Sequence, residues 1–196
     1  EHAKRNITLL MEVLKEEPDN IRWQTQLAQE YRSAMDWEQL AVYCQERVDS
    51  SGNQMMDEMT RLQFGTFLAG LVESLVHVEK YEECITKCGT ILEDEKANPL
   101  LKAHACICMA EAYFGLGEWD KASKYANIYL KEEQRLNGTD VLSYEQKLVS
   151  IVQYAFDPSN KKKAYSILIC QDMKQGSTAC LHEYYAALEW NEIENY

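Results

Sequence analysis

The sequence predicts an all-α protein, folded as a right-handed α-solenoid of antiparallel helix pairs with roughly ten helices. Apolar residues recur at helical spacing along most of the chain, and no stretch shows the alternation of a strand. Breaks rich in Pro, Gly, Asn and Asp separate the periodic segments. The segment from Leu27 to Val48 shares its pattern of small and aromatic residues with the segment from Ala110 to Leu130, so the helix pair is an internal repeat.

The first helices follow from apolar spacing and from caps. A leading helix is expected over residues 1–17, where Ile7, Leu10 and Leu14 recur at helical spacing. The turn Pro18-Asp19-Asn20 ends this helix and offers caps for the next one. The first helix pair is therefore expected over residues 20–49.

The later elements are bounded in the same way. The second pair is expected over residues 57–95, with a long first helix, and the third over residues 99–136, where Asn98-Pro99 opens it. A fourth, degraded pair is expected over residues 140–174, with a turn at Asp157-Pro158, and a terminal helix over residues 177–194. Residues 1–196 are expected to form one domain, and the start at Glu1 without Met indicates a fragment of a longer chain.

Charge and composition narrow the range of partners. The net charge of -12 and the pI near 4.8 argue against a nucleic-acid-binding face, which needs clustered Lys and Arg. Seven cysteines, an odd number within helical patterns and without a signal peptide, indicate a reducing, cytoplasmic compartment. No stretch approaches about 20 consecutive apolar residues, so no contact with a membrane through a span is expected.

The repeated unit resembles a tetratricopeptide repeat. The first helix of that repeat has a large residue, a small residue and then an aromatic residue, which this chain supplies twice, at Leu27, Ala28 and Tyr31 and at Met109, Ala110 and Tyr113. The family's turn favours Gly, an acidic residue and an aromatic residue, as in Gly117, Glu118 and Trp119. Met35 occupies the glycine position of the first turn, where the family's tight turn has a positive φ, so the residue type leaves the geometry of this turn open.

This resemblance implies a concave face that is lined by the first helix of each pair and binds a protein or peptide. The family's groove positions correspond here to Arg22, Thr25, Gln29, Arg32, Thr66, Ala69, Glu73, His77, His104, Ile107, Glu111 and Phe114. The subfamily that binds the acidic tails of chaperones has Lys and Asn where this chain has Thr25 and Gln29, so that ligand is disfavoured. We expect replacement of Arg32 and Glu73 to weaken peptide capture without lowering the melting temperature.

Motifs for catalysis are absent from the sequence. It has no GxSxG, HExxH, phosphate-binding glycine loop or dinucleotide fingerprint. Cys44, Cys84 and Cys88 fall at packing positions of the repeat, and no paired CxxC motifs occur, so we interpret the cysteines as buried packing residues. No catalytic residue, metal or cofactor is expected.

A second resemblance concerns the opening of the chain. Residues Arg5 to Leu40 are similar to the region that follows the catalytic domain in bacterial family 2 glycosyltransferases with carboxyl-terminal tetratricopeptide repeats. There a helix of the form RN-x-x-LL precedes a Pro-Asp turn and an LAQEY helix. The resemblance implies a non-catalytic accessory module, with an Asp-x-Asp catalytic domain upstream that this segment lacks.

Three hypotheses for function follow. The chain is an accessory repeat module that binds protein or peptide, a free-standing adaptor or peptide-sensing regulator, or a structural dimerisation unit that uses Tyr184, Tyr185 and Trp190. The sequence leaves the oligomeric state open, and it does not decide whether the groove is filled by the chain itself.

Overall fold

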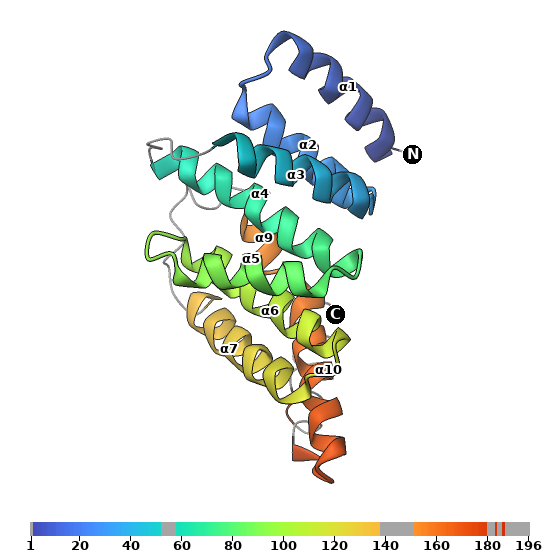
Figure 1. Cartoon of the computed structure of the whole chain (residues 1–196), viewed down its shortest axis with the longest axis vertical. Coiled ribbons are helices and arrows are strands. Elements are labelled where there is room, and N and C mark those ends of the chain that lie inside the picture. Colours follow the sequence, from blue (N-terminus) through green and yellow to red (C-terminus); the bar gives the residue numbers. More distant parts are fainter. Residues whose placement is uncertain (1, 52–57, 138–150, 180–182, 184–185, 187–196) are drawn as a thin grey trace.

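The computed structural model describes residues 2–51, 58–137, 151–179, 183 and 186, and within these residues the protein is all-helical, without a strand. The helices are α1 (His2–Glu16), α2 (Ile21–Ser33), α3 (Trp37–Ser51), α4 (Glu58–His77), α5 (Tyr81–Glu93), α6 (Pro99–Gly115), α7 (Trp119–Asn137), α9 (Ile151–Ala155) and α10 (Pro158–Lys174). They are stacked along the long axis, with α1 at one end and α10 at the other (Figure 1). The all-α prediction is confirmed.

Local caps fix where several helices begin. The side chain of Asn20 accepts hydrogen bonds from the backbone N–H groups of Arg22 and Trp23 at the start of α2. Asn98 caps α6 in the same way, and Pro99 then occupies the first turn, where its missing N–H costs nothing. These caps lie where the Asn and Pro residues predicted helix starts.

Tight turns with a left-handed residue end α2, α4, α6 and α10. The residues with positive φ are Met35 at 55°, Glu79 at 59°, Gly117 at 75° and Gly176 at 71°. Met35 thus adopts the conformation that Gly117 adopts in the later turn, although a side chain in this region costs about 1 kcal/mol or more. The residue type at position 35 left the geometry of this turn open, and the structure shows a left-handed residue there without glycine.

The packing order is regular from α2 to α7. Helices α2, α4 and α6 pack on one another in succession, and α10 packs on α6. Each of α3, α5 and α7 packs between two of these helices, as α5 does between α4 and α6. Helix α6 contacts five other helices, and its residues from Leu100 to Met109 are buried almost without interruption, which explains why it is apolar on all sides.

The segment after α7 differs from the expected fourth pair. Helix α9 packs on α4 and α6, whereas α10 packs on α7 and α6. In chain order α9 follows α7, yet it packs on α4, the first helix of the second pair before it, as well as on α6 of the preceding pair (Figure 1). The rest of the expected pair, residues 140–150, lies outside the described residues, as does most of the terminal helix expected over 177–194, including Tyr184, Tyr185 and Trp190. In the described part of the chain, no helix is both long and apolar enough to span a membrane.

Candidate functional site

Four of the nine polar residues that were predicted to line the groove meet where α9 and the start of α10 lie on the earlier helices. These are Arg32 of α2, Glu73 of α4, and His104 and Glu111 of α6. We call the side of α2, α4 and α6 that carries these four residues the α9 face. The residues that it holds are Tyr154, Asp157 and Lys163, all of them distant in sequence.

The other five polar residues predicted for the groove are arranged differently. Thr25 and Thr66 are buried in helix packing, and Gln29 is partly buried. Arg22 is exposed over the ring of Trp23, and His77 is exposed and stacks on Trp37, with ring centroids 3.8 Å apart. None of these five takes part in the ion pairs of the α9 face that are described next.

Arg32 connects Glu73 of the α9 face to Asp157 of the segment that lies on it. Its Nε and Nη2 donate to the two carboxylate oxygens of Glu73, at 2.7 and 3.0 Å, and Nη2 also donates to Asp157 Oδ2 at 2.8 Å. Burial of Arg32 opposes its charge, but these carboxylates outweigh burial and raise the pKa of Arg32. Partial burial likewise acts to raise the pKa of Asp157, but hydrogen bonds from Ser159 and Arg32 outweigh it and lower that pKa. Both groups are therefore charged at neutral pH, and they form a fork of the kind for which Arg is suited.

The ring of Tyr154 is inserted fully into the α9 face. It is 0% exposed, with the guanidinium of Arg32 4.4 Å from its centroid and the ring of His104 5.3 Å away at an angle of 64°. Its hydroxyl points at Gly70, where an added Cβ would lie 3.1 Å from the hydroxyl oxygen and 2.9 Å from Cys44 Sγ. Glycine at position 70 is therefore a condition for this close approach. The hydroxyl has no hydrogen-bond partner among the described residues.

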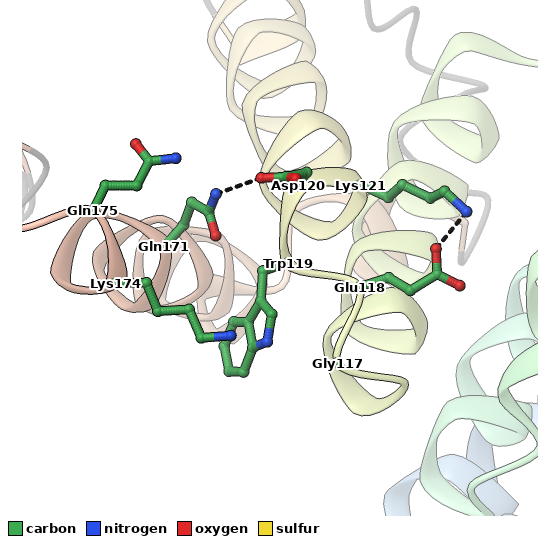
Figure 2. Close-up of a pocket in the computed structure, with 8 residues that line it drawn as sticks. All are labelled: Gly117, Glu118, Trp119, Asp120, Lys121, Gln171, Lys174 and Gln175. Atoms are coloured by element: carbon green, nitrogen blue, oxygen red, sulfur yellow. Dashed lines mark hydrogen bonds and ion pairs between the residues drawn. The ribbon is translucent and has the colours of Figure 1, made fainter.

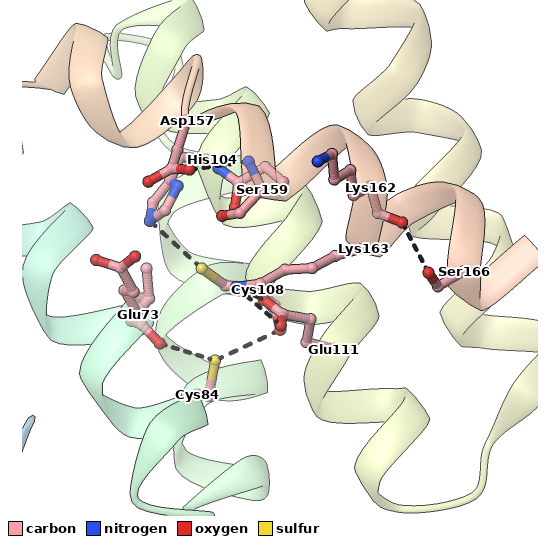
Figure 3. A network of polar contacts seen from close by, with 12 residues as sticks. Glu73, Cys84, His104, Cys108, Glu111, Asp157, Ser159, Lys162, Lys163 and Ser166 are labelled. Atoms are coloured by element: carbon pink, nitrogen blue, oxygen red, sulfur yellow. Dashed lines mark hydrogen bonds and ion pairs between the residues drawn. The ribbon is translucent and has the colours of Figure 1, made fainter. Parts of the chain in front are cut away.

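The backbone of the inserted segment is held as well. The carbonyl oxygen of Tyr154 accepts hydrogen bonds from His104 Nδ1 at 3.0 Å and from Asn160 Nδ2 at 2.7 Å. Burial lowers the pKa of His104 to about 4, so the ring is neutral at pH 7. Since Nδ1 must donate to the carbonyl, Nε2 is the acceptor, and the Cys108 thiol donates to it at 3.4 Å. Figure 3 shows this contact, with Glu73, Cys84 and Glu111 nearby.

A second ion pair closes the far end of the site. Lys163 of α10 lies 3.1 Å from Glu111 Oε1 and 3.4 Å from Oε2 (Figure 3). Burial raises the pKa of Glu111, while Lys163 acts in the opposite direction. The pair ties the first turns of α10 to α6.

The cysteines nearby are packing residues with inert thiols. Cys44, Cys84, Cys88 and Cys108 are each at most 1% exposed, which confirms the predicted burial of the first three. Burial raises the pKa of Cys44, Cys88 and Cys108, so their thiols stay protonated. The described residues include no group of three or more His, Cys, Asp or Glu side chains that could hold a metal ion.

The sequence left open whether the chain itself fills the groove, and in the structure α9 covers the α9 face. Glu73 is 7% exposed and His104 is 0% exposed, because α9 lies over them. Replacement of Arg32 and Glu73 was expected to leave the melting temperature unchanged. Because the two residues form a poorly exposed ion pair, each single substitution would strand a charge, and we expect it to lower stability. Neither Tyr154 nor Asp157 was assigned to the site from the sequence. The only sequence signal there was the Asp157-Pro158 break, which marks the start of a helix.

A separate hollow of about 470 Å³ lies between the start of α7 and the end of α10 (Figure 2). Lys174 Nζ lies 3.7 Å from the centroid of Trp119, and Gln171 Nε2 donates to Asp120 Oδ1 at 2.6 Å. These contacts join the two helices, and the described residues of this hollow include no group of three or more side chains that could hold a metal ion.

Comparisons with known proteins add no indication of a function. No protein-family model, no curated protein and no solved structure matches this chain.

Proposed function

We propose that the chain is a non-catalytic helical-repeat scaffold, a right-handed α-solenoid of the tetratricopeptide type, that binds a protein or peptide segment on the α9 face. The observation that carries this proposal is the seating of α9. Three successive helices of the stack hold one short segment through an aromatic ring, a backbone carbonyl and a carboxylate. These are the contacts by which a repeat scaffold binds a peptide.

The solenoid part of the proposal is supported by the packing order. The alternation of α2, α4 and α6 with α3, α5 and α7 is the order expected for stacked helix pairs, and the turns after α2, α4 and α6 share a left-handed residue. The small residues Ala28 and Ala110 are completely buried, as close approach of paired helices requires.

The proposal that the scaffold is non-catalytic is supported by the burial of its nucleophilic and basic side chains. A thiol and an imidazole do lie together, at Cys108 and His104, but both are at most 1% exposed and the thiol pKa is raised by burial. A substrate cannot reach this pair while α9 is in place. We expect no hydrolysis or transfer when the chain is incubated with nucleotide sugars, and turnover above background would contradict this.

The resemblance of residues 5–40 to the repeats that follow glycosyltransferase domains remains a prediction. The sequence of the complete gene tests it, because an upstream Asp-x-Asp domain would support an accessory role and a helix-turn-helix would support a regulator.

The binding proposal is tested by panning a random peptide library against the full chain. Selected peptides should bind the wild type and Arg22→Gln alike, because Arg22 is exposed and makes no ion pair of the α9 face. They should bind Arg32→Gln at least about tenfold more weakly, as expected for loss of a central Arg contact. Equal binding by all three folded proteins, or no selected peptide, would contradict the proposal.

A further inference from the structure

We infer that residues Ile151–Asp157 are a built-in ligand of the α9 face, and that this face selects partner peptides with an aromatic residue followed three positions later by a carboxylate. This inference rests on the proposed function and names its ligand. The pattern is that of Tyr154 and Asp157, both of which contact Arg32.

The aromatic part of the pattern follows from the pocket. Arg32 and His104 border the Tyr154 ring, and Gly70, Leu40 and Cys44 line the space that its hydroxyl enters. Because this space is apolar and gives the hydroxyl no partner among the described residues, it suits a phenyl ring better than a phenol. Tyr154 therefore fills the pocket with one group that the pocket does not satisfy, and a partner with Phe at this position has an advantage over it.

The carboxylate part follows from Arg32. One face of the guanidinium lies over the aromatic ring, and its Nη2 reaches the carboxylate three residues further on. Glu73 binds Arg32 through both of its oxygens, independently of Asp157. When Asp157 leaves, Arg32 still has its bidentate partner, so release of the segment does not strand a buried cation.

The remaining contacts are ones that another peptide could supply. His104 donates to a backbone carbonyl, which every peptide has. The side chain of Ile151 lies against Gly65, where an added Cβ would be 3.0 Å from its Cδ1, so the position three residues before the aromatic residue is apolar. The ligand class is thus a peptide of the form apolar-x-x-aromatic-x-x-acidic.

A competing peptide can bind only those molecules in which the built-in ligand has left the site. Its apparent affinity is therefore its intrinsic affinity multiplied by the fraction of such molecules. The test uses a fluorescein-labelled peptide, Ile-Val-Gln-Tyr-Ala-Phe-Asp, with the sequence of residues 151–157, and fluorescence polarisation with the full-length chain. Asp157→Asn keeps the N-cap of α10 but removes the charge, and it should bind the peptide about fivefold more tightly than wild type. Tyr154→Ala should bind it at least about tenfold more tightly.

Controls distinguish tighter peptide binding caused by release of the built-in ligand from non-specific binding by a destabilised chain. Gln153→Ala changes an exposed residue of α9 and should bind like wild type. The peptide with Ala in place of its Tyr should not bind Tyr154→Ala, while the peptide with Phe should bind more tightly than the original. If Tyr154→Ala does not fold, Asp157→Asn decides the result.

The inference is overturned if the folded variants bind the peptide no better than wild type, or if replacing its Tyr by Ala leaves binding unchanged. If library peptides of unrelated pattern still bind in an Arg32-dependent way, the proposed function stands and only the ligand class is wrong. If neither these nor the labelled peptide bind, both proposals fall.

Discussion

Removal of a single oxygen atom should stabilise this protein. The Tyr154 ring is fully buried and its hydroxyl has no partner in the described structure, so Tyr154→Phe removes a buried, unsatisfied polar group. Leaving such a group buried costs about 1–3 kcal/mol, and the ring contacts to Arg32 and His104 remain. Allowing for the small void left beside Cys44, we expect a net gain of about 1 kcal/mol in the free energy of unfolding. For a chain of 196 residues this corresponds to a rise of about 2–4 °C in Tm.

Tyr129 provides a matched control. It is 1% exposed, but its hydroxyl donates to the carbonyl oxygen of Ala155 at 3.0 Å. Tyr129→Phe should therefore lower the free energy of unfolding by about 1 kcal/mol, the opposite sign. Urea unfolding at pH 7.5, followed by circular dichroism, measures both. Equal destabilisation by the two substitutions would refute the placement of the Tyr154 hydroxyl in an apolar space.

Three further substitutions or conditions test other parts of the structure. Asp157→Asn should lower the free energy of unfolding by about 1 kcal/mol, because the ion pair with Arg32 is lost while the cap of α10 remains. Asp157→Ala should lower it by about 1 kcal/mol more, because the cap is lost as well. Equal losses for the two variants in urea unfolding would show that the cap does not contribute to stability. The pKa of His104 is about 4 in the folded protein and near 6.5 when unfolded, so the unfolded chain binds the extra proton and stability, complete above pH 6.5, falls as the pH drops toward 4. Between pH 7.5 and 5 this loss is about 2 kcal/mol, and His104→Gln should flatten the pH profile measured by urea unfolding. Met35→Gly should raise stability by about 1 kcal/mol, because Met35 is exposed with φ at 55°, whereas glycine at exposed Met173 within α10 should lower it by a similar amount; a fall for both would contradict the turn geometry.

Local chemistry made the helices predictable from the sequence. Asn20 and Asn98 cap helices where the sequence indicated, because a cap involves only neighbours within three residues. The burial of Cys84 and Cys88 was predicted from their packing positions in the repeat. By contrast, Glu79 adopts a positive φ that nothing in its residue type indicates.

The candidate site was predictable only in part. Arg32, Glu73 and His104 were assigned to one face from repeat register, and they do meet there. What covers that face depends on a contact between Arg32 and Asp157, which are 125 residues apart in sequence. Periodicity describes one helix at a time, so it paired residues 151–155 with the following helix and could not place them against α4 and α6.

Hydrogen exchange of the full chain tests most directly whether the α9 face holds a replaceable segment. With mass-spectrometric readout, amides of residues 151–157 should exchange through a local opening whose free energy is at least about 2 kcal/mol below that of α6. A saturating amount of the labelled peptide, in its form with Phe in place of Tyr, should speed exchange in residues 151–157 of the chain and leave α6 unchanged. Exchange of residues 151–157 only together with α6, and unaltered by the peptide, would contradict the account.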